Sequence, residues 1–191
     1  MNLKRYMQSY IRQEIKTLKK LNLDEINDAA NAIVDCRNRG GIVYTMGNGG
    51  SAATASHFVC DFAKGLSENV EGQKFKFECL CDNTPLFLAI GNDIGYDEVF
   101  RFQLKDKLTE NDLVLAISGS GNSQNIINAC KYAKEVGAKI IGISGYDGGE
   151  LYQISDYHMH APIDDMQIAE DIHMIFDHML LRVITQCANE K

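Results

Sequence analysis

Apolar and polar positions along the chain repeat with two different periods, which predicts helices alternating with strands. From Leu3 to Leu21 apolar side chains recur every three or four residues with basic residues between them, as in an amphipathic helix. A second helical pattern starts at Asp24, which we expect to cap it, and stops at Gly40. Short continuous apolar runs instead predict strands buried on both faces, at 42–46, 113–117 and 139–144.

The remaining patterns extend this alternation to the end of the chain. Residues 65–72 are polar and read as a loop, and two further strands are predicted at 75–81 and 157–161. Helical patterns fill the other gaps, starting after residue 50, at Thr84-Pro85, at 97–108, before Gly137, before Ile154 and over 165–188. Strands that alternate with helices predict a parallel sheet covered by helices on both faces.

The first helix precedes the first strand, so no strand–helix–strand crossover holds it against the sheet. Its apolar stripe therefore needs a partner. The sequence leaves two candidate partners for this stripe, the body of the same chain and a second subunit.

Composition and charge narrow the class of protein. The chain has 191 residues and a formal net charge of −7, with no basic cluster, which argues against nucleic-acid and anionic-membrane partners. It has no apolar run of about 18 residues and no apolar segment typical of a signal peptide near Met1. Its six cysteines are scattered, without zinc-ribbon spacing, and we expect reduced thiols in a cytoplasmic protein.

Candidate chemistry begins where the first predicted strand ends. Gly47, Gly49 and Gly50 allow a sharp turn or a close approach to a ligand, and Ser51 can cap the helix that follows. The free N–H groups and partial positive charge of a helix start favour an anion. Further along this helix, His57 and Asp61 are four residues apart and share one face, as an acid/base or metal-binding pair would.

A second small, polar loop follows the predicted strand at 113–117. Residues 118–123 contain three serines interleaved with Gly119 and Gly121 before the next helix, and they offer hydroxyl and amide donors suited to phosphate oxygens. Both loops fall at the carboxyl edge of the predicted sheet, where ligands bind in open parallel sheets. A capped turn that binds nothing is the alternative for either loop alone.

Nucleotide-binding motifs fit these loops poorly. No Gly-Lys-Ser/Thr sequence ends either loop, as a P-loop requires. Residues 47–52 begin like a dinucleotide fingerprint, with Ala52 in the last place, but no ribose-binding acid follows at the end of a second strand. We therefore expect a small phosphorylated metabolite and no nucleotide cofactor.

These loops, together with other short segments, resemble the sugar isomerase (SIS) domain family. The similar segments span almost the whole chain, at 47–51, 57–58, 91–93, 118–123, 147–149, 170–173 and His178. The resemblance implies an α/β fold, a three-layer α/β/α sandwich with a central parallel sheet and an extra N-terminal helix. One SIS domain would span 1–191, and the helices in 1–40 would make oligomer contacts in a homotetramer with active sites between subunits.

The resemblance also implies an activity and a set of binding residues. It implies isomerisation of sedoheptulose 7-phosphate to D-glycero-D-manno-heptose 7-phosphate, towards the heptose of surface polysaccharides. Phosphate would be held by Ser118, Gly119, Ser120 and Ser123. The sugar end would be lined by Asn48, Gly49, Gly50 and Ser51, with Asn92 and Asp93 nearby.

Members of this family can carry zinc, and the matching ligand positions are His57, Asp61, Glu170 and His178. Two of these depart from the family, which has Glu at position 61 and Gln at position 170. Aldose–ketose isomerisation needs a base and a second acid/base group, and we expect Asp61 or Glu170 to be the base and His178 its partner. Glu170 and His178 are about 12 Å apart along one helix, so we also expect two subunits to contribute.

Other residues and other functions stay open. His173, three residues after Glu170, is a spare candidate, whereas we expect His158 and His160 to be structural. The two departures are compatible with an isomerase of another ketose phosphate. They are also compatible with a non-catalytic SIS-fold module that binds a sugar phosphate or a protein.

Overall fold

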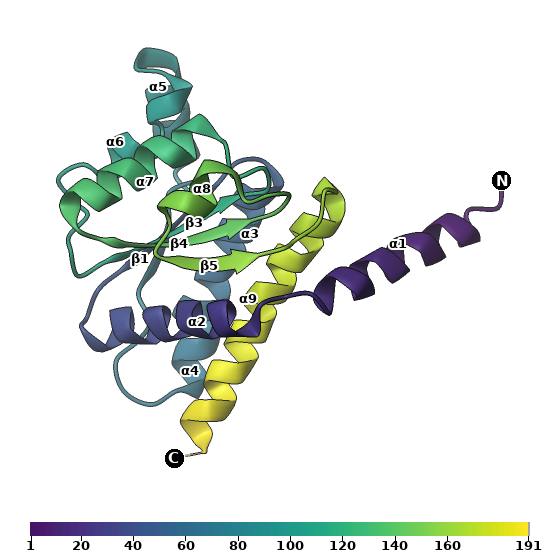
Figure 1. Cartoon of the computed structure of the whole chain (residues 1–191). Helices are drawn as coiled ribbons and strands as arrows, with labels where there is room; N and C mark the ends of the chain where they lie inside the picture. Colours follow the sequence, from purple (N-terminus) through teal and green to yellow (C-terminus); the bar gives the residue numbers. More distant parts are fainter. Residues whose placement is uncertain (191) are drawn as a thin grey trace.

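A five-stranded, all-parallel sheet forms the centre of the protein (Figure 1). The computed structural model describes residues 1–190. The strands lie in the order β2-β1-β3-β4-β5. Their bounds are β1 Val43–Gly47, β2 Phe77–Cys79, β3 Leu113–Ser118, β4 Lys139–Ser144 and β5 Tyr157–His160. Every residue of β1 and β3 is buried, as the continuous apolar runs predict.

Successive side chains of each strand enter two separate hydrophobic cores, one on each face of the sheet. Leu113 and Leu115 pack with α2 (Leu23–Asn38), α3 (Gly50–Val59) and α9 (Met166–Asn189). Val114 and Ala116 pack on the other face. That face is covered by α5 (Thr84–Asp93), α6 (Arg101–Leu104), α7 (Gln124–Val136) and α8 (Gly149–Ile154). The predicted three-layer α/β/α sandwich is thereby confirmed.

Some element boundaries differ from the predictions for local reasons. Asn22, not Asp24, caps α2, because the Asn22 side chain accepts from the Asp24 and Glu25 amides. Half of the predicted loop at 65–72 is helical, as the end of π-helix η1 (Cys60–Leu66) and the short α4 (Ser67–Asn69). The predicted helix at 97–108 is reduced to the 3₁₀ turn η2 (Tyr96–Glu98) and α6.

The first helix, α1 (Lys4–Leu18), projects away from the sheet and touches the body at α9 (Figure 1). The Tyr10 hydroxyl donates to Asp171 of α9. Leu18 also packs against the core. Most other large apolar side chains of the helix and its N-terminal flank are exposed, namely Leu3, Tyr6, Met7, Ile11 and Ile15. Over residues 1–190 no helix combines the length and the apolar character that crossing a membrane would require.

The serine-rich loop after β3 interlocks with the loop that follows β4. Gly119 and Gly121 accept backbone hydrogen bonds from Gly145 and Leu151, at 2.8 and 2.9 Å. Gly121 has φ +68°, and a Cβ atom there would lie 1.9 Å from the Gly148 carbonyl oxygen. Glycine at position 121 is therefore a requirement of loop packing.

We expect Gly121→Ala to destabilise the protein by at least about 3 kcal/mol, because a left-handed conformation and a backbone clash add up. Gly137→Ala is the matched control: its φ is +91°, but its Cβ atom would meet its nearest neighbour at 3.6 Å. That variant should lose only about 1–2 kcal/mol. Urea unfolding followed by circular dichroism measures both, and equal losses would contradict the role of the clash.

Candidate active site

The glycine loop between β1 and α3 is a close-packed turn with one open face. A Cβ atom on Gly47 would lie 2.4 Å from the Ser51 carbonyl oxygen, so the chain can turn back here only with glycine. Gly49, with φ +53°, occupies the cap position of α3 and has open space where a side chain would point. The prediction that Ser51 caps this helix is therefore wrong: Gly49 takes the cap position, and Ser51 is buried in the first turn.

Asn48 ties this loop to the start of α7. The side-chain amides of Asn48 and Asn125 hydrogen-bond to each other in both directions, at 2.9 Å each. The Tyr96 hydroxyl also donates to Asn48 Oδ1, at 2.8 Å. Sequence reasoning missed Asn125 and Tyr96, because neither belongs to a loop motif. Their signal was position alone: Asn125 is in the first turn after the second loop, and Tyr96 follows Gly95.

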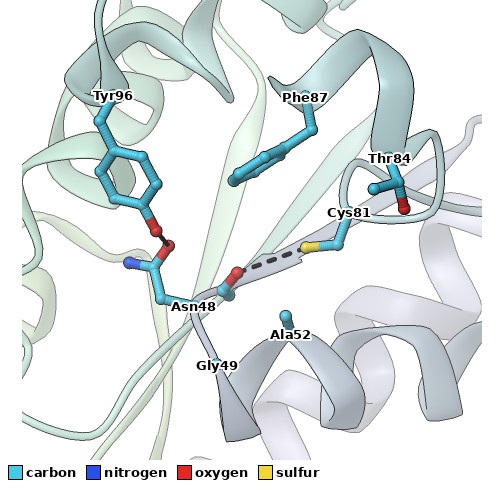
Figure 2. Close-up of a pocket in the computed structure, with 8 residues that line it drawn as sticks. Asn48, Gly49, Ala52, Cys81, Thr84, Phe87 and Tyr96 are labelled. Atoms are coloured by element: carbon cyan, nitrogen blue, oxygen red, sulfur yellow. Dashed lines mark hydrogen bonds between the residues drawn. The ribbon is translucent and has the colours of Figure 1, made fainter. Parts of the chain in front are cut away.

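A pocket of about 220 Å³ opens beside this loop. Figure 2 shows Phe87 and Tyr96 on one side of it and the α3 start, with Ala52, on the other. Cys81 also lines it and donates to the Gly47 carbonyl oxygen. Asn92 and Asp93, predicted near the sugar end, do not line this pocket; they are exposed and bond to each other.

The serine loop presents its donors at the start of α7. Ser118 is buried and its hydroxyl bonds to that of Ser123, at 3.2 Å. The Ser123 side chain makes no capping bond to α7. Of the first-turn amides, Ile126 N–H donates to Asn125 Oδ1, whereas those of Gln124 and Asn125 stay available for an anion. Ser120 accepts from the Asn122 amide. The structure thus brings the predicted phosphate residues to the carboxyl end of β3, beside the glycine loop at the end of β1.

Helices α3 and α9 run side by side in the same direction, and the rest of the site lies along this seam. At its upper end, Glu170 of α9 faces Gly50, where a Cβ atom would lie 2.8 Å from Glu170 Oε2. Seven residues further along both helices, His57 meets Asp177, with 3.6 Å between Nε2 and Oδ2. The seam therefore holds two groups of candidate site residues, separated by about 10 Å along the helices.

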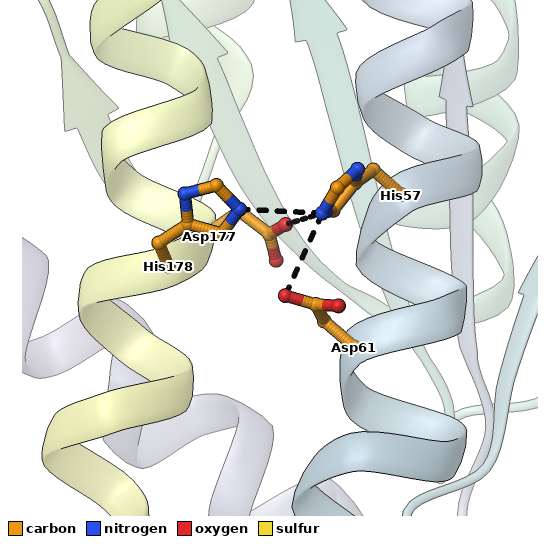
Figure 3. Close-up of side chains that lie close together, drawn as sticks. All are labelled: His57, Asp61, Asp177 and His178. Carbon is orange, nitrogen blue, oxygen red and sulfur yellow. Dashed lines mark hydrogen bonds and ion pairs between the residues drawn. The ribbon is translucent and has the colours of Figure 1, made fainter.

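The lower group is a cluster of His57, Asp61, Asp177 and His178, whose ligand atoms all lie within 4.8 Å of one another (Figure 3). His57 Nε2 is its centre, 3.2 Å from His178 Nε2 and 3.6 Å from Asp61 Oδ2. The His57 side chain is 42% exposed, so solvent reaches one side of the cluster. Asp61 stands at the start of η1, where the helix changes its winding, and π-helical turns often occur at functional sites.

Asp177 is the member of the cluster that sequence reasoning missed. Its side chain is 0% exposed, and neither carboxylate oxygen has a hydrogen-bond partner. Burial, and next the negative charge of Asp61, raise the pKa of Asp177 to about 7. A signal existed in the sequence: Asp177 lies in the helical stripe formed by the buried residues Ile172, His173, Phe176 and Leu180.

Glu170 does not join this cluster, although it was predicted as a metal ligand with His57, Asp61 and His178. The physical reason is the helical rise, which separates Glu170 from His178 along α9. His173, the spare candidate, is fully buried, and its Nε2 donates to the Ser144 carbonyl oxygen at 3.1 Å. It acts as a core residue that joins α9 to β4.

His158 and His160 lie on β5, far along the sheet from the glycine loop. The Tyr152 ring stacks on His158, with ring centroids 4.0 Å apart, and His160 Nδ1 bonds to the Ser144 hydroxyl at 3.0 Å. Burial lowers the pKa of both imidazoles. These contacts support the structural role expected for the two histidines.

Comparison with known proteins places this arrangement in a family. The family model described as the SIS domain matches residues 5–145. Phosphoheptose isomerase of Aliarcobacter butzleri is 35% identical over 161 residues, which cover 84% of each chain. Phosphoheptose isomerase of Campylobacter jejuni serotype O:6 is 34% identical over 176 residues, 92% of this chain and 91% of the relative.

Solved structures agree with the sequence comparison. A phosphoheptose isomerase from Francisella tularensis superposes with a TM-score of 0.86 at 29% identity, over 96% of both chains. One from Neisseria gonorrhoeae superposes with a TM-score of 0.87 at 27% identity, over the full length of both. The chain therefore belongs to the SIS domain family. Within it, the chain belongs to the phosphoheptose isomerases, which are aldose–ketose isomerases.

The buried His173 predicts a pH dependence of stability. Burial lowers the pKa of His173 to about 4, whereas in the unfolded chain it is about 6.5. The unfolded chain thus binds a proton that the folded state excludes, and stability falls as the pH drops from about 6.5 to about 4. At about 1.4 kcal/mol per pKa unit, the loss reaches roughly 3 kcal/mol.

The measurement is the free energy of unfolding in urea at pH 7, 6, 5 and 4, for the parent and for His173→Gln. Glutamine can keep the bond to the Ser144 carbonyl oxygen but does not titrate, so the difference between the two proteins isolates His173. The variant should lose less stability on acidification. A parallel decline in both proteins would contradict the prediction.

Proposed function

We propose that this chain interconverts sedoheptulose 7-phosphate and D-glycero-D-manno-heptose 7-phosphate, and so supplies heptose for surface polysaccharides. The observation that carries the proposal is the joining of two loops by the Asn48–Asn125 amide pair, at 2.9 Å. The loop at 118–123 is rich in hydrogen-bond donors for phosphate. The loop at 47–51 opens onto the α3–α9 seam, which carries carboxylates and imidazoles. The names of the relatives, phosphoheptose isomerase, support this substrate class.

We assign the phosphate to Ser118, Gly119, Ser120 and Ser123, together with the first-turn N–H groups of α7. These donors suit an anion because they belong to backbone and hydroxyl groups near a helix start. Residues 48–51 would then meet the sugar. Asn92 and Asp93 lie on the exposed end of α5, and we propose that they approach the sugar end of a neighbouring subunit's site.

The chemistry requires two proton movements. A base removes a proton from C1 of the ketose and returns it to C2, while a second group moves a proton between the two oxygens. We assign the base to Glu170, because its carboxylate faces Gly50 at the glycine loop. Asp61 is the alternative carboxylate, and His178 is the proposed second group; both lie in the lower cluster. Because this cluster is about 10 Å from Glu170 along the seam, we propose that Glu170 and His178 of one site come from two subunits.

Zinc is the proposed cofactor, because the lower cluster has the ligand types that it prefers. Two imidazoles and two carboxylates lie within 4.8 Å of one another, and the Asp177 carboxylate lacks any hydrogen-bond partner. A zinc ion bound there would balance the negative charge of the carboxylates and fix the positions of the cluster's side chains. His57, Asp61 and His178 would hold it.

We further propose a homotetramer in the cytoplasm. The exposed apolar stripe of α1 supports subunit contacts, because such a surface is rarely left uncovered. All six cysteines are free, as in a reducing compartment. Helices α1 and α2, within residues 1–40, would provide the contacts of one SIS domain that spans 1–191.

The reaction is tested with sedoheptulose 7-phosphate in deuterated water, read by NMR. We expect the aldose product, with deuterium at C2, because a base that exchanges with solvent carries the proton between the carbons. The assay is run with and without added zinc. Absence of both product and deuterium under both conditions would remove this substrate from the proposal.

The base is tested with Glu170→Gln and Asp61→Asn. If Glu170 is the base, Glu170→Gln should lower kcat by at least roughly 100-fold, in line with the contribution of general base catalysis. Asp61→Asn should lower it less. If instead Asp61→Asn loses more activity and Glu170→Gln keeps nearly full turnover, Asp61 would be assigned as the base.

Assembly is tested by analytical ultracentrifugation. Ile11→Glu places a charge within the apolar stripe of α1 and should shift the protein from the mass of four chains to smaller species. Gln8→Glu is the control, because it adds the same charge at an exposed polar position of the same helix. Two variants with the same mass as the parent would contradict the proposed contact.

A further inference from the structure

The strongest unexplained feature of the molecule is the buried Asp177 carboxylate. It is fully inaccessible to solvent, and neither oxygen accepts a hydrogen bond. A buried carboxylate without hydrogen bonds is costly unless a positive charge or a proton compensates it. Something that the polypeptide does not provide is therefore expected at this position.

The neighbouring side chains do not supply enough positive charge. Among residues 1–190, the ion pair of Asp177 is with His57, at 3.6 Å, and His57 is also paired with Asp61 at 3.6 Å. No Lys or Arg side chain of the described residues pairs with either carboxylate. Two carboxylates thus share one imidazole, whose Nε2 also faces the His178 ring nitrogen at 3.2 Å.

The distances match a single tetrahedral cation. With zinc–ligand bonds of about 2.05 Å and tetrahedral angles, two ligand atoms lie about 3.3 Å apart. The observed separations from His57 Nε2 are 3.2 Å to His178 and 3.6 Å to each carboxylate. The remaining separations stay within 4.8 Å, so the ligand atoms would have to approach one another by at most about 1.5 Å to complete the shell.

We propose that Asp177 is the fourth protein ligand of a divalent cation, zinc by its ligand types, together with His57, Asp61 and His178. Asp177 thereby takes the ligand place that the family resemblance assigns to Glu170. The two aspartates carry two negative charges, which balance one divalent cation in a partly buried site.

This assignment separates the roles of the carboxylates along the seam. Asp177 and Glu170 are seven residues apart on α9, or about 10 Å along the helix axis. Glu170 stays free of the cation and faces the glycine loop. The inference rests on the zinc site of the proposed function, but it concerns the ligand set and does not depend on the substrate.

The test is metal binding by the full-length chain, stripped with a chelator, in the absence of substrate. Calorimetry with Zn²⁺ gives affinity and stoichiometry, and visible absorption with Co²⁺ reports the coordination geometry. The parent should bind one ion per chain and show the intense Co²⁺ bands of a tetrahedral site.

Asp177→Asn and Asp177→Leu should each weaken Zn²⁺ binding by at least roughly tenfold, and reduce the Co²⁺ bands. The leucine variant places an apolar side chain at the buried position, so it tests loss of the ligand without leaving a buried polar group. Glu170→Ala is the matched control, because it removes the carboxylate from the same helix and leaves no side-chain ligand atom at this position, and its affinity should stay within about threefold of the parent.

Two results would overturn the inference. One is a parent that binds no Zn²⁺ or Co²⁺ at millimolar concentration. The other is tight binding that survives in both Asp177 variants, whether or not Glu170→Ala weakens it. Failure of the proposed function is a different result. A parent that binds zinc through Asp177 but does not isomerise the substrate would refute the reaction alone.

Discussion

The parallel packing of α3 and η1 against α9 is the constraint on which the candidate site depends. These helices are more than a hundred residues apart in the sequence, yet Gly50 faces Glu170 and His57 faces Asp177. Glycine at position 50 allows the upper contact as it stands, since a Cβ atom there would lie 2.8 Å from Glu170 Oε2 and the carboxylate would have to shift. Because both helices rise equally per residue, contact at one level sets the pairing at the next.

Much of the fold could be predicted from the sequence, because a buried parallel sheet leaves a plain pattern. The apolar runs of β1, β3 and β4 and the small polar loops after β1 and β3 mark strands and ligand-binding edges without reference to tertiary contacts. The loop at 118–123, proposed to bind phosphate, was located in this way. The fold family followed from the loops and from short segments elsewhere in the chain.

The site was harder to predict where tertiary contacts determine which side chains lie together. Asp177 lies in the apolar stripe of α9, which is a signal of burial, but only the neighbouring α3 shows that its carboxylate meets His57. Asn125 and Tyr96 gain a role only because Asn48 reaches them across the sheet edge. Glu170 was matched to the family by motif, but the helical rise keeps it out of the cluster that contains His178.

The interlocking of the serine loop with the loop after β4 has a thermodynamic consequence. Gly119 and Gly121 accept backbone hydrogen bonds from Gly145 and Leu151. The hydrogen-bond donors that we propose for phosphate therefore belong to a loop that the protein itself orders. Binding to an ordered loop loses little conformational entropy. The loop would then bind the phosphate group of sugars of different length equally well. The side chains of the α3–α9 seam would discriminate among these sugars.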